Sequence, residues 1–178
     1  MNRLRTFALG LLLLTTAAAC SDQNECDSDA CRSIAAQLVF NEIAGTGGDF
    51  AELLNTGASP LDVSGYGLTD SNADGSPRPD RAIRFPAGTV IAPGAYLLVM
   101  MESNCPTGLT GAVCFRGEVG LSQAEGENVH LVDASNRVVL TGVYPANGAP
   151  AGRAWARSPN GTGAFMNLVR SPGRSNTP

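Results

Sequence analysis

The chain has 178 residues, of which 16% are charged, and a formal net charge of −4 at pH 7. That length is enough for one packed core and hardly enough for two, which excludes a large multidomain architecture. The balance is acidic, the chain contains no lysine, and no nucleic-acid partner is predicted.

The first residues have the pattern of an export signal. Arg3 and Arg5 form a basic start, residues 7–14 form an apolar run, and residues 17–19 form a small-residue cleavage region. The apolar run is about half of the roughly 20 residues that a membrane-spanning helix needs, so no permanent transmembrane helix is predicted here. We assign residues 1–19 to a signal peptide.

Cys20 follows this region directly, and the arrangement resembles a bacterial lipoprotein signal, although Ala17 stands where that family usually has Leu. The resemblance implies that Cys20 becomes the lipidated first residue of the mature chain, and fatty acyl chains such as palmitate would then anchor it to the membrane. Ser21, and not an aspartate, comes next, which favours the outer membrane of the bacterial envelope. Ordinary signal cleavage after Ala19 is the competing interpretation.

The cysteine count favours lipidation and indicates disulfides. Of the five cysteines, lipidation of Cys20 leaves an even number to pair in an oxidising compartment. Cys26 with Cys31 and Cys105 with Cys114 is the simplest of the three possible pairings. Each short loop would contribute about 2–3 kcal/mol. Zinc is a weaker alternative, because no histidine lies near and the spacings are not those of zinc ribbons.

Residues 20–36 are polar and acidic, and we predict that they form a spacer. Residues 37–178 have short apolar or alternating runs separated by Gly, Pro, Asn and Asp, which predicts an all-β sandwich or barrel. No segment outside the signal shows helical periodicity over more than two turns. The expected strands are 38–43, 50–55, 66–69, 81–85, 95–100, 128–133, 137–143 and 153–157.

The stretch from 38 to 70 places acidic and amide side chains inside strand-like runs. It reads LVFNEIAGTGGDFAELLNTGASPLDVSGYGLTD, and its polar positions are Glu42, Asp49, Glu52, Asn55, Asp62 and Asp70. This pattern resembles the lamin tail domain, an immunoglobulin-like module that also occurs in exported bacterial proteins. FPAGT at 85–89, NVHLVD at 128–133 and RSPNG at 157–161 extend the resemblance to about residue 176. Phe50, where the family commonly has Trp, and the cysteine-bracketed insertion at 102–118 depart from it.

The resemblance implies an immunoglobulin-like β-sandwich that is not an enzyme and that acts as a protein-binding or scaffolding module. Together with the signal, it predicts a lipid-anchored protein of the cell envelope, with the membrane and another protein as partners and no cofactor. The alternatives are a calcium-dependent adhesin and an accessory module of an envelope hydrolase.

The motif residues can also be explained by a structural role, without any catalytic activity. Alternation along a strand places Ala51, Leu53 and Asn55 on one face, and Phe50, Glu52 and Leu54 on the other. A hairpin loop at 45–49 would bring Glu42 opposite Glu52, where like charges destabilise a sheet. We therefore predict that Arg153 or Arg157 separates the two carboxylates.

Three weaker signals remain. Asp70, Asn72 and Asp74 have the spacing of a calcium loop, but a polar turn is the favoured interpretation, because Arg81 occupies the position of the last ligand. His130, the one histidine, lacks the partners that catalysis needs. Four aromatic residues are candidates for a carbohydrate or peptide platform, although core packing explains them equally well: Tyr66, Tyr96, Tyr144 and Trp155.

Overall fold

The computed structural model describes residues 28–178. The predicted signal peptide, the lipidation site Cys20 and the disulfide cysteine Cys26 lie outside these described residues. Within them, no helix is long and apolar enough to cross a membrane.

A short helix precedes the first strand. Helix α1 (Asp29–Gln37) begins at Ser28, whose Oγ accepts a hydrogen bond from the backbone N–H of Cys31 at 3.2 Å. The side chain of Ile34 packs into the main core, and Leu38 continues the chain into a strand without a loop. From the sequence we assign residues 20–36 to a spacer, and the helix instead extends the packed body to Asp29.

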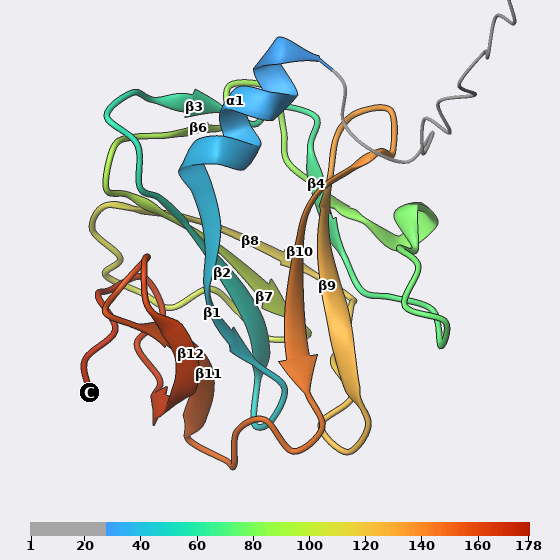
Figure 1. Ribbon diagram of the computed structural model, residues 1–178, viewed down its shortest axis with the longest axis vertical. Coiled ribbons are helices and arrows are strands. Elements are labelled where there is room, and N and C mark those ends of the chain that lie inside the picture. Colours follow the sequence, from blue (N-terminus) through green and yellow to red (C-terminus); the bar gives the residue numbers. More distant parts are fainter. Residues whose placement is uncertain (1–27) are drawn as a thin grey trace, which may run out of the picture.

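The fold is an immunoglobulin-like sandwich of two main sheets (Figure 1). The larger has six strands in the order β12-β11-β1-β2-β7-β8 and the smaller has four in the order β10-β9-β4-β5. A third sheet pairs β3 with β6, and every pairing except β7 with β8 is antiparallel. The strands are β1 (Leu38–Ala44), β2 (Asp49–Asn55), β3 (Leu61–Asp62), β4 (Gly67–Thr69), β5 (Ile83–Arg84), β6 (Val90–Ile91), β7 (Tyr96–Met101), β8 (Ala112–Gly117), β9 (Gly126–Val132), β10 (Val138–Pro145), β11 (Arg153–Ser158) and β12 (Ala164–Val169).

All eight expected strands are present, with bounds that shift by up to two residues. The structure adds β3, β6, β8 and β12, and a 3-10 turn at Pro79–Arg81 occupies the start of the strand expected at 81–85. β8 lies within the predicted cysteine-bracketed insertion. That insertion therefore contributes a strand to the larger sheet.

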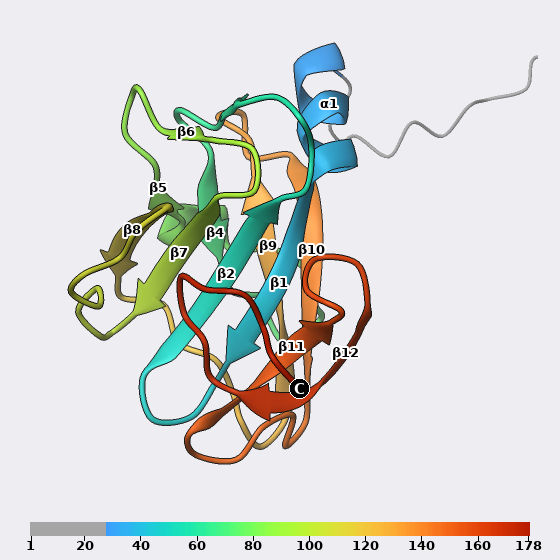
Figure 2. The ribbon, with the colours of Figure 1, turned by 90° about the vertical axis from the view of Figure 1, so that its left-hand side faces the viewer.

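Apolar side chains fill both faces of the larger sheet. Its inner face packs against the smaller sheet around Phe40, Ile43 and Leu53. On its outer face lies a second cluster that includes Phe50 and Leu98. The outer face is covered by the loop that the disulfide Cys105–Cys114 closes and by residues 170–178, which we call the C-terminal strap. Figure 2 shows the strap, in dark red, crossing β2 and β1.

A β-bulge in β1 decides which side chains meet the strap. The register of β1 against β2 shifts between Phe40 and Glu42. As a result, Phe40 and Ile43 both reach the inner core although two residues separate them. Both intervening residues, Asn41 and Glu42, then hydrogen-bond with groups on the outer face.

Candidate functional site

Two buried carboxylates face each other under the C-terminal strap. Glu42 on β1 is the register partner of Glu52 on β2, as predicted, and both residues are 0% exposed. The alternation predicted for β2 is also confirmed, because Ala51 and Leu53 belong to the inner core and Phe50 to the outer cluster.

The strap supplies the hydrogen-bond donors for both carboxylates. Glu42 accepts from the backbone N–H of Ser171 at 2.9 Å and from its hydroxyl at 2.8 Å. Glu52 accepts from the side-chain amide of Asn41 at 2.9 Å and from the backbone N–H of Gly173 at 2.6 Å. The two glutamates therefore fix the chain's last segment to the centre of the larger sheet.

The prediction that Arg153 or Arg157 separates the glutamates is wrong. Arg153 donates to the side chain and carbonyl of Asn167, and Arg157 donates to the backbone carbonyls of Phe40 and Gly163. The positive charge that acts on Glu42 is that of Arg170, the first residue of the strap. Backbone and hydroxyl donors from the strap take the place of the predicted ion pair.

Three asparagines complete this network. Asn41 donates to Asn160 at 3.1 Å and accepts from the backbone N–H of Gly161 at 2.9 Å. Asn176 donates to the carbonyls of Asn41 and Arg157, both at 3.0 Å. No buried side-chain nitrogen or oxygen of residues 28–178 lacks a partner. Asn176 is not identified from the sequence, and its bond to Asn41 joins residues 135 positions apart in the chain.

Burial sets the protonation of the pair. It raises the pKa of Glu42, against the opposing effects of Ser171 and Arg170. It raises the pKa of Glu52 to about 8, against the hydrogen bonds from Asn41 and Gly173, and the charge of Glu42 adds to the rise. Unequal carboxyl pKa values are the pattern of an acid–base pair. Here, however, the hydrogen bonds of both groups hold the strap, and neither residue is exposed. We therefore assign both glutamates a structural role, that of holding the strap on the larger sheet.

Of the other motif residues, Asp62 and Asn55 hold turns, and Asp49 joins the start of β2 to a loop distant in the sequence. Asp49 accepts from the backbone N–H of Leu121 at 3.0 Å, and Asp62 accepts from that of Ser64 at 2.9 Å. Asn55 accepts from the N–H of Gly57 in the predicted turn and donates to the carbonyls of Ser59 and Ile91. Each side chain replaces a backbone partner where a strand ends.

The residues that have the spacing of a calcium loop, Asp70, Asn72 and Asp74, form a tight turn. Asp70 is buried, with its carboxylate 3.3 Å from Arg78 and 3.8 Å from Arg81. Asp74 accepts from Ser76, and Asn72 donates to the same residue. In the part of the chain that is described, no group of three or more acidic, histidine or cysteine side chains could hold a metal ion.

The single histidine and the aromatic residues serve different parts of the fold. The ring nitrogens of His130 lie 3.0 Å from the hydroxyl of Thr141 and 3.0 Å from the carbonyl of Gly75. Tyr144 is buried in the main core, while Tyr96 hydrogen-bonds with Asn160. The four candidates do not form one platform: Trp155 lines the groove described below, and Tyr144 lines a different pocket.

One predicted disulfide is confirmed. Cys105 and Cys114 are bonded, with a Cα–Cα separation of 6.0 Å, and the bond ties the loop after β7 to β8. Cys31 is also disulfide-bonded, and the pairing predicted for it, with Cys26, lies outside the described residues.

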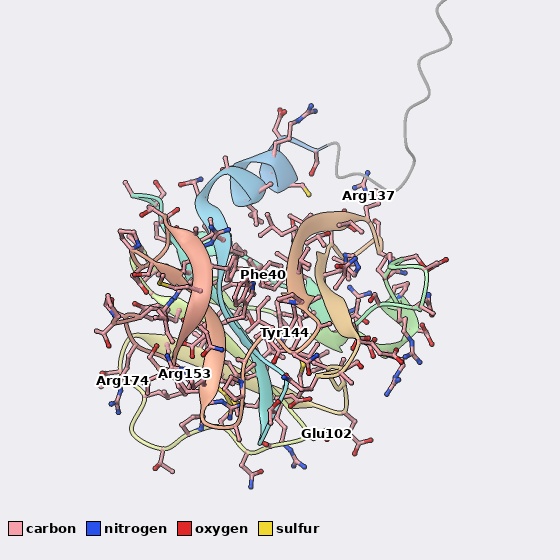
Figure 3. All side chains as sticks on the ribbon, turned by 60° about the horizontal axis from the view of Figure 1, so that its bottom comes forward. Phe40, Glu102, Arg137, Tyr144, Arg153 and Arg174 are labelled. Atoms are coloured by element: carbon pink, nitrogen blue, oxygen red, sulfur yellow. A yellow bond between two sulfur atoms is a disulfide. The ribbon has the colours of Figure 1, made fainter. Side chains whose placement is uncertain are left out.

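A groove of about 490 Å³ lies where the two sheets meet at one side of the sandwich. Its lining comes from one sheet's β1, β11 and β12 and from the other sheet's β10. The lining residues are Val39, Phe40, Leu140, Thr141, Gly142, Val143, Pro145, Trp155, Arg157 and Phe165. Figure 3 labels Phe40 near the centre of the molecule, and this residue belongs both to the lining of the groove and to the main core.

Local packing keeps the groove open and shapes its aromatic wall. β11 pairs with β1 only through Ala156 and Trp155, so the first half of β1 has no strand partner on that side. The rings of Trp155 and Phe165 stack with centroids 6.2 Å apart, and the guanidinium of Arg157 lies 4.4 Å from the centroid of Phe165. The sequence alone does not predict this site, because its walls come from strands more than a hundred residues apart.

Comparison with known proteins adds the family. The model of the lamin tail domain family matches residues 32–146, which span the structure from α1 to the end of β10. No curated protein matches the chain.

Proposed function

Because the chain belongs to the lamin tail domain family, we propose that it is a lipid-anchored protein of the bacterial cell envelope whose domain binds another protein. Domains of this family are immunoglobulin-like and non-catalytic and often mediate protein interactions. The export signal and Cys20 support a lipid anchor, and Ser21 supports the outer membrane. The domain acts as a scaffold and catalyses no reaction.

The groove between the sheets is the observation that carries the binding role. The acidic and amide residues of the motif already hydrogen-bond to other parts of the chain. The groove, in contrast, combines aromatic, aliphatic and cationic side chains at the surface. Val143 at its rim is 58% exposed, the second-highest exposure among the exposed large hydrophobic residues of the described chain. Exposed apolar surface beside polar groups is typical of a site that another molecule covers.

We expect Cys20 to carry the anchor. Metabolic labelling with an alkyne analogue of palmitate should mark the full chain produced in a Gram-negative host and place it in the membrane fraction. The Cys20→Ala variant should lose the label and leave the membrane, because acyl chains supply the stable attachment. Cys105→Ser is the control for loss of a cysteine and should keep the label. A wild-type protein without label would contradict the anchor.

Photo-crosslinking tests the binding surface. p-Benzoyl-phenylalanine is placed at Val143 in the groove or at Val90 on β6, the matched control, which is 44% exposed. Irradiation of intact cells should give a discrete protein adduct from position 143 and none from position 90. Equal adducts from the two positions, or adducts from position 90 alone, would reject the groove as the binding surface.

A further inference from the structure

The strand that forms one wall of the groove is an edge strand. β10 pairs with β9 on one side only and ends the order of its sheet. The backbone N–H of Asn128 on β9 donates to Ser71 Oγ, on the side away from β10. In an antiparallel ladder, the register partner of such a residue directs its own N–H and C=O away as well. The partner is Val143, so the backbone groups of Val143 and of Thr141, two residues earlier, face the open edge.

The space beside this edge suits the side chains of an additional strand. A strand added to β10 would continue the smaller sheet, and its inward-facing side chains would lie against Trp155 and Phe165 across the groove. Gly142 lets the backbone of β10 approach the core closely, because a Cβ at this position would lie 2.8 Å from Phe40 Cγ and 2.9 Å from Ile43 Cδ1. β10 therefore packs directly on the core and leaves the groove open above it.

The groove also holds a positive charge that no acidic group balances. Arg157 donates to two backbone carbonyls, at 2.7 and 2.8 Å, and its guanidinium lies over Phe165. Within residues 28–178, no carboxylate comes within 4.0 Å of it. Burial lowers the pKa of Arg157, which reflects the loss of water around the charge. A carboxylate brought by a partner would gain a charge-assisted hydrogen bond here.

We propose that the partner presents an extended segment that adds to the free edge of β10, with apolar side chains at alternate positions against Trp155 and Phe165 and a carboxylate against Arg157. This inference rests on the proposed function and specifies the chemistry of the partner. Backbone hydrogen bonds to Thr141 and Val143 give the affinity, and the alternate side chains give the selectivity. The open edge and the apolar groove are thereby covered together.

A peptide library tests this mode of binding. Its members have the pattern Lys-x-Thr-x-Thr-x-Lys, with Val, Phe or Asp at each position x, and binding is followed by NMR shifts of the protein's backbone amides. We expect the members that combine apolar residues with one Asp to bind, with the largest shifts at Thr141 and Val143. Replacing Asp by Asn in the best peptide should weaken it about tenfold.

Two variants separate the backbone contacts from the charge contact. Val143→Pro removes an N–H that faces the open edge and no hydrogen bond of the sheet, so the protein should fold and lose peptide binding at least tenfold. Arg157→Gln should bind the Asp and Asn peptides equally. Arg153→Gln, on the same strand but outside the groove, is the matched control and should bind as the wild-type protein does.

Several outcomes would overturn the proposal. One is a library in which no member shifts the amides of β10, and another is a Val143→Pro variant that binds normally. A protein that dimerises through β10, seen by light scattering, would assign the edge to a second copy of the chain. If a crosslink from position 143 persists while every peptide fails, the protein-binding function stands and strand addition is wrong.

Discussion

The Glu52→Gln variant should show a nearly constant free energy of unfolding between pH 6.5 and 9, where the wild-type protein loses about 2 kcal/mol. The pKa of Glu52 is about 8 in the folded protein and starts from 4.5. The folded protein therefore keeps a proton that the unfolded chain releases above pH 4.5. The resulting stabilisation is complete below that pH and is lost as the pH rises towards 8.

Other titrating groups determine the pH range over which the effect of Glu52 is measured best. Burial lowers the pKa of His130 from 6.5, so its contribution has the opposite sign: stability rises with pH and levels off about one pH unit above 6.5, inside the window. Burial raises the pKa values of Tyr66 and Tyr96 from 10.0, and their contribution begins near the upper end. Comparing variant with wild type at each pH removes the contributions that both proteins share.

The slope with pH, and not the absolute stability, identifies the effect of Glu52. Glutamine offers one acceptor oxygen where Glu52 accepts from both Asn41 and Gly173, so the variant should be less stable by about 1–3 kcal/mol at pH 6.5. Urea unfolding followed by the fluorescence of Trp155 gives both quantities. Glu125→Gln, at an exposed glutamate, is the control and should retain the wild-type slope. A Glu52→Gln protein that also retains it would contradict the buried proton.

Asn41→Ala should destabilise the protein by about 3–5 kcal/mol. The side chain of Asn41 is fully buried and satisfies three groups at once: Glu52, Asn160 and the N–H of Gly161. Alanine leaves all three without that partner, and water reaches them only if the strap lifts. Denaturant unfolding measures the loss.

The matched control for this variant is Asn72→Ala, which removes an exposed asparagine from a surface turn. Its effect should stay below about 1 kcal/mol, because water replaces the lost hydrogen bonds. A loss of stability in Asn41→Ala no larger than in this control would show that the strap is held by something other than the amide network.

The sequence predicts the strands whose pattern is local. Alternation in β2 and the glycine-rich loop before it are enough to place Glu42 opposite Glu52, and the structure confirms this register. Helix α1 is missed because its nine residues make less than three helical turns and only Cys31 and Ile34 are buried, too few for a clear helical periodicity. β8 is missed because its side chains are only partly buried and its parallel pairing with β7 depends on a long connection.

The hydrogen-bond donors to the two buried carboxylates could not be predicted from local sequence patterns, and the reason is physical. A paired positive charge is the simplest way to bury two glutamates, and Arg153 and Arg157 lie on the strand that neighbours β1. The chain instead returns over the sheet and provides backbone N–H groups, which every residue type except proline carries. Because such donors leave no signature in the sequence, the position of the strap could not be predicted. The groove could not be predicted either, because its walls come from two different sheets and the sequence does not show how the sheets pack together.

The central claim is that the buried acidic and amide residues hold the fold and that the edge of β10 binds the partner. The most direct test measures the affinity of the best library peptide for the Glu52→Gln and Val143→Pro proteins at pH 6.5, where both should be folded. We expect Glu52→Gln to bind within about twofold of the wild-type protein and Val143→Pro to bind at least tenfold more weakly. Normal binding by Val143→Pro together with loss of binding in a folded Glu52→Gln protein would contradict these roles.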